Sequence, residues 1–320
     1  MKAIVCTRYG SPDVLELQEV EKPIPKEDEV LVKVHASSAT TADTMMRRGT
    51  PFYARLFLGF TKPKPAITGT GFAGEVEAVG RNVTRYQEGD KVFGETGVGF
   101  SANADYVCIP ETGVMTTLPN NMTYEAAAPI CDGALTSFSF LKDIATLQEG
   151  DEILINGASG SLGTAAVQIS KYLGAQVTGV CGSANQEMVQ ELGAQKTIDY
   201  TKADYTRMDH HYDIIFDTIG KSSFGDSKHS LTQTGLYLSP VLNMALLLQM
   251  LWTSQSRGKK AKFSATGLRP EDELRALLED LKEVFESGKM TTVIDQYFPL
   301  EDTAEAHRYI ETGHKRGNVV

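Results

Sequence analysis

Cysteine is scarce in this sequence, and its few thiols lie far apart. The four cysteines among 320 residues are Cys6, Cys108, Cys131 and Cys181. Because no two of them lie within four residues of each other, the spacing indicates neither a zinc ribbon nor a disulfide framework. The six histidines form no spaced cluster either, since His210 and His211 are adjacent and the others stand alone. We predict no metal site and four reduced, mostly buried thiols, as in a cytosolic protein.

The sequence also lacks an excess of positive charge and a long apolar run, and both absences restrict the class of protein. Lys and Arg number 31 and Asp and Glu 41, a formal charge of −10, which argues against nucleic acid and anionic membranes as partners. Residues 1–5 read as a strand and not as a targeting leader. The most apolar stretch, 236–252, contains Ser239, Pro240 and Asn243, so a buried strand and a helix at a subunit contact fit it better than a membrane span. We expect a cytoplasmic protein.

The most informative segment is 151–163, Asp-Glu-Ile-Leu-Ile-Asn-Gly-Ala-Ser-Gly-Ser-Leu-Gly. A short apolar strand runs into three glycines, and a helical pattern follows at once. Gly157 permits a tight turn, Gly160 lets the backbone approach a pyrophosphate, and Gly163 lets the new helix pack close to the strand. The N–H groups at the start of that helix then face the phosphates. The predicted phosphate-binding residues are Gly157, Ser159, Gly160, Ser161, Leu162 and Gly163.

The end of the next strand favours NADPH over NADH. An NAD site usually places Asp or Glu there, about 20 residues after the first glycine, to hold the ribose 2′-hydroxyl. Here residues 180–185 read Val-Cys-Gly-Ser-Ala-Asn, and the first acid is Glu187. Small polar residues leave room for a 2′-phosphate, which Ser183 and Asn185 can hydrogen-bond and which Tyr200 and Lys202 can approach. The alternative is that 182–185 is simply an exposed turn.

The length and the order of the predicted elements indicate an α/β protein of two domains. Residues 1–120 are rich in short strands, predicted at 3–6, 14–20, 29–35, 74–80 and 90–93. From residue 151 strands and helices alternate, which predicts a doubly wound parallel sheet with right-handed crossovers. An amphipathic helix at 271–287, a helix at 301–312 and a strand at 318–320 complete the chain. We predict a nucleotide domain at 123–266, inserted into a second domain made of 1–122 and 267–320.

Motifs along the whole chain resemble those of the medium-chain dehydrogenases and reductases, and among them the zinc-free branch of quinone oxidoreductases and enone reductases. Besides the glycine turn, the resembling segments are Val-His-Ala-Ser-Ser at 34–38 with Asp43, Gly-Thr-Gly-Phe-Ala-Gly at 69–74, Gly-Asp-Lys-Val-Phe-Gly at 89–94, Ala-Asp-Tyr at 104–106, Ala-Leu-Thr at 134–136 and Gly-His-Lys-Arg-Gly-Asn-Val at 313–319. The resemblance implies a GroES-like catalytic domain, a Rossmann domain and a cofactor between them. It also implies a homodimer.

The sequence departs from the zinc-dependent members of that superfamily. They carry a Cys in the segment that here reads Ala-Thr-Thr-Ala-Asp at 39–43, and a His where this chain has Phe72. The four-cysteine lobe that holds a structural zinc is also missing. The quinone reductase pattern has an Asn and a Tyr where this chain has Thr40 and Met45, so the tyrosine acid is not available. Without a Lewis acid, plain alcohol oxidation loses its means of stabilising an alkoxide. We therefore expect no zinc.

The resemblance suggests a mechanism in which hydride passes from NADPH to a quinone or to the β-carbon of an enone. The hydroxyls of Thr40, Thr41 or Tyr53 would donate to the developing oxyanion, with water giving the last proton. Thr136 would lie near the nicotinamide, and Thr218, Ser239 and Asn318 would line the riboside. A carboxylate beside an enolate would be repulsive, so Asp43 is expected to cap a helix or to orient a neighbour. The loops at 45–62 and 242–260 would select the substrate.

Three other readings differ in function. A non-catalytic NADPH-binding member of the superfamily would share the glycine turn and lack turnover. A zinc alcohol dehydrogenase would need the missing ligands. A short-chain dehydrogenase would need Lys four residues after Tyr, and none of the twelve tyrosines has that spacing.

Overall fold

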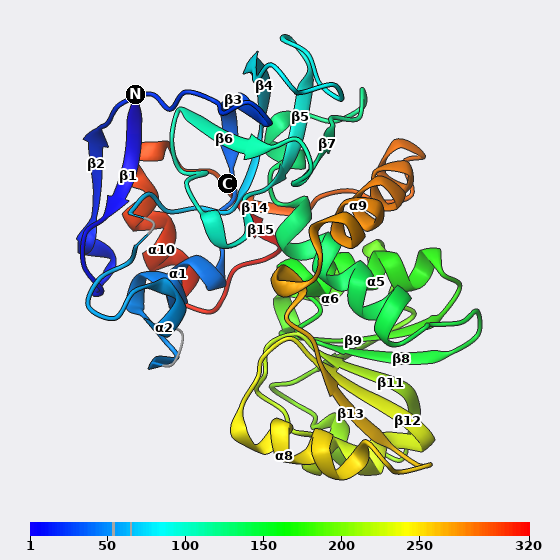
Figure 1. Ribbon diagram of the computed structural model, residues 1–320. Coiled ribbons are helices and arrows are strands. Elements are labelled where there is room, and N and C mark those ends of the chain that lie inside the picture. The colour runs from blue at the N-terminus through cyan, green and yellow to red at the C-terminus, as the bar shows by residue number, and fades with distance from the viewer. Residues whose placement is uncertain (53–54, 65) are drawn as a thin grey trace. The chain divides into compact units, whose positions relative to one another are not determined.

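The structure is a computed structural model that describes residues 1–52, 55–64 and 66–320, without the side chain of Phe57. The chain forms two compact units, one of Met1–Asp132 with Gly267–Val320 and one of Gly133–Thr266 (Figure 1). The sequence placed the first boundary at 122 instead of 132. The α/β class, with a β-rich unit and a parallel-sheet unit, is confirmed.

The first unit is built on a five-stranded antiparallel sheet in the order β6-β3-β4-β5-β7. Alternating residues of these strands, such as Val32, Val76 and Val92, meet in one core. The strands of this unit are β1 (Lys2–Cys6), β2 (Leu15–Glu19), β3 (Glu29–Ser37), β4 (Gly71–Val79), β5 (Lys91–Glu95), β6 (Tyr106–Pro110), β7 (Val114–Thr117), β14 (Ile294–Gln296) and β15 (Asn318–Val319).

The helices of this unit come from both ends of the chain. They are η1 (Pro12–Val14), α1 (Thr41–Arg48), α2 (Arg55–Leu58), η3 (Gly97–Gly99), α3 (Tyr124–Ala127), α9 (Glu271–Glu286), η10 (Leu300–Asp302) and α10 (Thr303–Glu311), with η9 (Thr266–Leu268) at the boundary. Of these helices, α3 and α9 pack on the five-stranded sheet. The apolar stripe predicted for α9, including Leu274, Leu278 and Leu281, is buried as expected. The C-terminal strand β15 pairs with β14 and bridges to Ala39, so the end of the chain completes the N-terminal unit.

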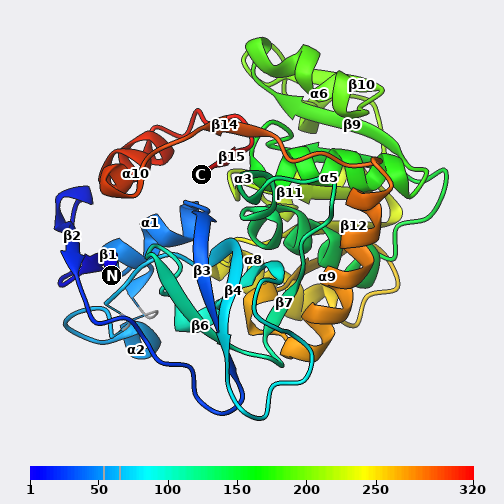
Figure 2. The ribbon, with the colours of Figure 1, turned by 90° about the horizontal axis from the view of Figure 1, so that it is seen from above.

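The second unit is a six-stranded parallel sheet in the order β10-β9-β8-β11-β12-β13. Ile153, Leu154 and Ile155 of the central strand are fully buried, as expected where helices cover both faces. Figure 2 shows α6 beside β9 and β10. The elements are β8 (Glu152–Asn156), α5 (Ser161–Tyr172), β9 (Gln176–Cys181), η6 (Ser183–Asn185), α6 (Gln186–Leu192), β10 (Lys196–Asp199), η7 (Tyr205–Arg207), β11 (Tyr212–Asp217), α7 (Phe224–Ser227), η8 (Lys228–Ser230), β12 (Leu231–Ser239), α8 (Met244–Thr253) and β13 (Lys260–Phe263).

Residues 134–144 carry apolar residues at the spacing of an α-helix, but they form no continuous α-helix. The structure has wide π-type turns there, η4 (Ile130–Leu135) and η5 (Ser139–Ile144), around the short α4 (Thr136–Phe138). Apolar spacing alone does not distinguish such turns from an α-helix. The apolar segment 236–252 forms the buried end of β12 and then the helix α8, as expected; most of α8 is exposed, and only Leu246 of that helix is buried. None of the helices in the described part of the chain is both long and apolar enough to cross a membrane.

Candidate functional site

The glycine turn after β8 has the geometry of a phosphate-binding loop. Gly157 has a positive φ of 81°, a conformation that favours glycine. At Gly160, which precedes α5, a Cβ atom would meet only Gly157 O, at 3.6 Å, so this side of the turn is open. At Gly163 a Cβ would collide with Gly157 O and would lie 2.7 Å from Ala158 C. The third glycine thus brings α5 against the turn itself, whereas the sequence argument placed the close contact on the strand.

The parallel sheet gathers several predicted cofactor residues at one edge. The ladder pairs Asn156 with Asp217 and Cys181 with Asp199, so the carboxyl ends of β8, β9, β10 and β11 are adjacent. Ser159 Oγ accepts a hydrogen bond from Asn185 Nδ2 at 3.3 Å, which ties the glycine turn to η6. Ligands of doubly wound sheets bind at this edge.

Asp217 organises the loop that follows β11, and the sequence argument did not identify it. Its buried carboxylate accepts hydrogen bonds from Asn156 Nδ2 at 3.0 Å and from the Tyr237 hydroxyl at 2.9 Å. It also accepts from the backbone of Gly220 and Ser222. The neighbouring Thr218, a predicted riboside contact, donates to Asn156 O at 2.8 Å. Ser239 is buried at the end of β12 and lines a small cavity with Gly220, Ser222 and Asn243.

A carboxylate that the sequence argument missed lies at the corner predicted to hold a 2′-phosphate. Ser183 Oγ donates to Asp199 Oδ2, and Lys202 Nζ lies 3.1 Å from the same oxygen. Hydrogen bonds from Ser183 and Thr201 hold the pKa of Asp199 well below its usual range. Tyr200 is 62% exposed beside this pair, and its ring is near Gly182. The corner therefore combines one negative and one positive side chain with two donors.

In the first unit, Thr40 and Asp43 form a capping box at the start of α1. Thr40 Oγ1 accepts a hydrogen bond from Asp43 N at 3.0 Å, and Thr40 N donates to Asp43 Oδ2 at 2.8 Å. The Thr40 hydroxyl also lies 2.7 Å from Asp43 Oδ2. Asp43 is thus a helix cap, as expected. Thr41 is exposed in the first turn, and Tyr53, the third predicted donor, lies outside the described residues.

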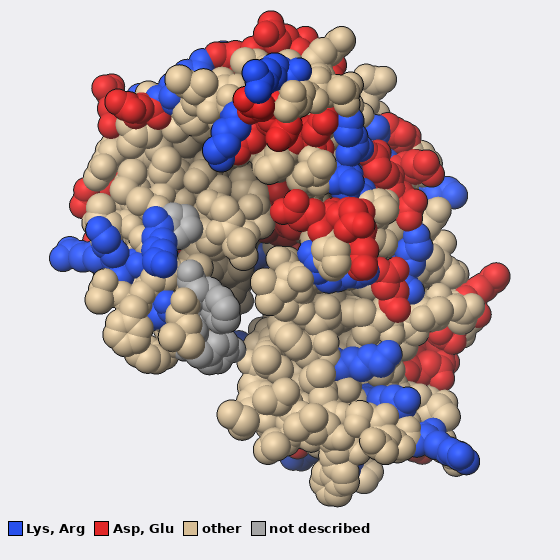
Figure 3. Space-filling model, in the orientation of Figure 1, with Lys and Arg blue, Asp and Glu red and all other residues tan. Residues whose placement is uncertain are grey.

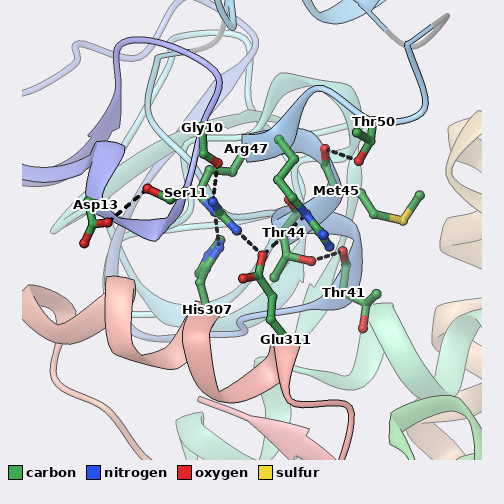
Figure 4. Close-up of polar contacts among 11 residues, drawn as sticks. Gly10, Ser11, Asp13, Thr41, Thr44, Met45, Arg47, Thr50, His307 and Glu311 are labelled. Carbon is green, nitrogen blue, oxygen red and sulfur yellow. Dashed lines mark hydrogen bonds and ion pairs between the residues drawn. The ribbon is translucent and has the colours of Figure 1, made fainter.

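A buried arginine fixes the far end of α1. Arg47, with 0% exposure, donates to Gly10 O and to His307 Nδ1, and forms an ion pair with Glu311 of α10 (Figure 4). Burial, with the nearby Arg47 charge, lowers the pKa of His307 to about 3. Figure 4 shows the Met45 side chain pointing away from this network. With both ends held, α1 presents the Thr40 turn in a defined position.

Asp132 lies where β3, β4 and η4 meet. Its Oδ2 accepts a hydrogen bond from Ser38 Oγ, and its Oδ1 accepts one from Thr70 Oγ1 at 3.3 Å. A Cβ on Gly71 would lie 2.8 Å from Asp132 Oδ2 and 2.6 Å from Ala128 O, so only glycine leaves room for this carboxyl. The sequence argument gave no role to Asp132, because residues 38, 70 and 132 are distant along the chain.

Burial shifts the pKa values of the charged groups around Asp132 toward their neutral forms. Burial, followed by the Asp132 charge, raises the pKa of Asp43 to about 7 and that of Glu95 to about 8. Desolvation raises the pKa of Asp132 as well. Burial lowers the pKa of Lys315 to about 8, against the attraction of Asp132. The loss of hydration is the largest cause of all four shifts, and the Asp132 charge adds to it only at Asp43 and Glu95. Among the described residues, no three His, Cys, Asp or Glu side chains are placed to hold a metal ion.

The remaining predicted residues fall in both units. Ser161 and Leu162 form the half-buried first turn of α5, and Thr136 is half-buried on α4. Ser137 Oγ donates to Leu162 O at 2.9 Å, so α4 and α5 are linked. Asn318 belongs to the first unit, where its Nδ2 donates to Val293 O at 3.0 Å. Its predicted contact with the riboside stays a prediction.

Two family models match this chain, the alcohol dehydrogenase GroES-like domain at residues 26–120 and the zinc-binding dehydrogenase domain at 192–320. Quinone oxidoreductase of Pseudomonas aeruginosa is 30% identical and covers 100% of this chain and 98% of its own. Quinone oxidoreductase of Sus scrofa is 29% identical, with 99% and 95% covered. The 2-methylene-furan-3-one reductase of Solanum lycopersicum is 28% identical, with 100% and 78% covered.

Solved structures show the same fold. The quinone oxidoreductase of Coxiella burnetii superposes with a TM-score of 0.88 at 27% identity, covering 100% of this chain and 98% of that one. The quinone oxidoreductase of Escherichia coli, a complex with NADPH, gives a TM-score of 0.85 at 23% identity, covering all of both chains.

Proposed function

Because the chain belongs to the medium-chain dehydrogenases and reductases, in their quinone oxidoreductase branch, we propose that it reduces a quinone or an α,β-unsaturated carbonyl compound with NADPH and without zinc. Like its relatives named quinone oxidoreductase and 2-methylene-furan-3-one reductase, it is an NAD(P)H-dependent oxidoreductase. The observation that carries the proposal is the open glycine turn between β8 and α5.

The residues of that turn fit a dinucleotide. The side of Gly160 is open, and the first turn of α5 offers N–H groups and a helix dipole to a pyrophosphate. Thr218 and Ser239 lie at neighbouring strand ends. Ser183, Tyr200 and Lys202 form the corner that we assign to the 2′-phosphate, where Lys202 offsets the charge of Asp199. When bound, NADPH supplies the hydride.

The choice of acceptor follows from what the first unit offers. A quinone or enone spreads the incoming charge over a conjugated system, so its reduction needs hydrogen-bond donors and no Lewis acid. Thr40 is half-buried and held in the capping box, and Thr41 is exposed beside it. Phe72 and Thr40 stand where the zinc-dependent members were expected to have ligands. Because the Thr40 hydroxyl donates to Asp43 Oδ2 at 2.7 Å, the exposed Thr41 hydroxyl is the member of this turn that supports a donor role.

Loss of absorbance at the reduced-nicotinamide band tests the proposal. Purified protein is offered NADPH or NADH with a panel of quinones and a panel of short enones, before and after dialysis against a chelator. We expect turnover with NADPH on one of the panels, unchanged by the chelator. Stoichiometric zinc whose removal stops turnover contradicts the zinc-free mechanism. Tight NADPH binding without turnover on either panel identifies a cofactor-binding protein instead of a reductase.

A further inference from the structure

We propose that Asp132 is the catalytic acid of this reductase. The inference rests on the proposed function, since only a reduction of this kind consumes a proton. Hydride adds to the β-carbon of the enone, and the π electrons move to the carbonyl oxygen to form an enolate. The O–H bond of the Asp132 carboxyl then breaks, and its proton bonds to the α-carbon. The carboxylate left behind regains a proton from water.

Two hydroxyl groups on neighbouring strands orient this carboxyl. Ser38 directly follows β3, and its N–H donates to Gly71 O at 3.0 Å. Thr70 directly precedes β4, and its carbonyl accepts from Thr96 N at 2.9 Å. Because each hydroxyl binds a different oxygen of Asp132, the plane of the carboxyl is fixed. A reacting acid needs such a fixed direction to protonate one atom of a bound substrate.

The surroundings make room for the acid and leave it accessible. Gly71 lacks the Cβ that would collide with Ser38 Oγ and crowd Asp132 Oδ2. Asp132 lies in the wide turn η4, and π-type turns inside helices are frequent at functional sites. Its side chain is half-buried, whereas Ser38 and Asp43 behind it are each 1% exposed. Asp132 is therefore exposed enough to reach both a ligand and water, as are Glu95 and Lys315, which are also half-buried.

Burial favours the protonated acid: desolvation raises the pKa of Asp132, against the hydrogen bonds from Ser38 and Thr70 and the charge of Lys315. Asp43 on α1, Glu95 on β5 and the Cys131 thiol each interact with Asp132, and Lys315 beyond α10 is the positive group that faces it. Asp295 also interacts with Lys315. In the part of the chain that the structure describes, Asp43 Oδ1 is buried with no hydrogen-bond partner, as for a carboxyl group that need not be ionised.

The proposal also removes the objection to carboxyl groups near an enolate. An ionised carboxylate would repel the developing charge, but a neutral carboxylic acid donates a hydrogen bond to it. The same proton that prevents repulsion in the resting enzyme is the one consumed in the reaction.

The test compares Asp132→Asn and Asp132→Glu with the wild type on whichever acceptor it reduces. Asp204→Asn is the control, because Asp204 likewise accepts two hydrogen bonds, from the backbone N–H and the hydroxyl of Thr206, but lies exposed in the second unit. We expect Asp132→Asn to lower kcat about 10²- to 10⁴-fold, the range for loss of a general acid. The dissociation constant of NADPH, followed by fluorescence, should stay unchanged. Asp132→Glu should regain part of the rate, and Asp204→Asn should behave as wild type.

Two readouts separate an acid from a structural residue. The wild-type rate should fall at alkaline pH as the acid ionises, and this fall should vanish in Asp132→Asn. Ser38→Ala removes a hydrogen bond to the ionised form, so it should move the fall to higher pH. An infrared titration of the cofactor-free protein should lose one protonated carboxyl band in Asp132→Asn. If the Asp132→Asn variant does not fold, Ser38→Ala still tests the proposal. A shift of the alkaline fall in rate to higher pH supports it, and a shift to lower pH or no shift contradicts it.

Turnover by Asp132→Asn at the wild-type rate, with the alkaline fall retained, overturns the assignment while leaving the proposed function intact. A wild type that reduces neither quinones nor enones overturns the proposed function first, and the acid assignment with it.

Discussion

At the scale of single residues, the side chains of Lys202 and Asp199 determine the net charge around Ser183, in the corner that we assign to the 2′-phosphate. We expect Lys202→Ala to raise the KM for NADPH about tenfold, because a charge-assisted bond to the 2′-phosphate is lost, and to leave the KM for NADH unchanged. Lys196→Ala, at the opposite end of β10, is the control and should alter neither value. Steady-state kinetics with both cofactors measure the effect. Equal changes for NADPH and NADH would place the phosphate elsewhere.

His307 predicts a loss of stability in acid. Its pKa is about 3 in the folded chain and about 6.5 in an unfolded one. Between these values the unfolded chain binds the extra proton, so the free energy of unfolding decreases as pH falls from about 6.5 toward 3, by up to about 1.4 kcal/mol per pH unit. His307→Gln keeps an acceptor for Arg47 and should flatten the dependence of Tm on pH in this range. His314→Gln, at an exposed position, should not. A dependence as steep in His307→Gln as in the wild type would refute this explanation.

Sequence reasoning reached some of these residues and not others. Gly157, Gly160 and Gly163 could be identified because their contacts are local and their spacing follows from the turn. Asp199 and Asp132 could not, since each acquires its role from partners far along the chain. Ser183 and Asp199 are 16 residues apart, and Ser38 and Asp132 are 94 apart.

At the scale of elements, two glycines where the turn meets α5 have different roles. Gly160 leaves the proposed phosphate site open, whereas Gly163 lets α5 pack against the turn. Gly160→Ala adds a methyl group on the open side, so we expect an unchanged Tm and an NADPH dissociation constant raised at least about tenfold by the blocked backbone approach. Gly163→Ala pushes α5 from Gly157 and Ala158, so both Tm and affinity should fall. Gly267→Ala, with nothing within 4 Å, is the control. Thermal melts and NADPH titrations give both quantities, and an unchanged affinity in Gly160→Ala would contradict the assignment of the turn.

The helices and strands can be predicted from the sequence where one hydrophobic period or one local capping pattern determines them. The apolar stripe of α9 and the cap at Thr123, whose hydroxyl accepts from Ala126 N at 3.3 Å, are local features. The strands β6, β7, β13 and β14 were not predicted, because short segments of mixed polarity become strands only through their neighbours in the sheet. The π-type turns around α4 have no sequence signal of this kind.

At the scale of the whole molecule, α8 offers a large apolar surface. Trp252 is 86% exposed, and Leu248 and Leu251 are each at least 60% exposed. Figure 3 shows few charged residues over this part of the second unit. The neighbouring β13 is the last strand of its sheet within the described residues. The predicted homodimer would cover both features, as stable interfaces cover apolar patches.

We therefore expect Trp252→Glu to shift the protein from dimer to monomer in light scattering after size exclusion. Ile24→Glu, at an 87% exposed position in the first unit, should leave the mass unchanged. A Trp252→Glu protein with wild-type mass would place the subunit contact elsewhere, and a monomeric wild type would refute the homodimer.

The pairing of β15 with β14 and Ala39 has a consequence for biosynthesis. The second unit is one uninterrupted stretch, so its sheet can form as soon as residue 266 has left the ribosome. The first unit begins to emerge earlier and yet needs residue 319 to close over Ala39. The unit that begins to be translated first is therefore completed last. A chain truncated shortly before residue 319 would contain a complete second unit and a first unit that lacks the pairing of β15 with β14 and Ala39.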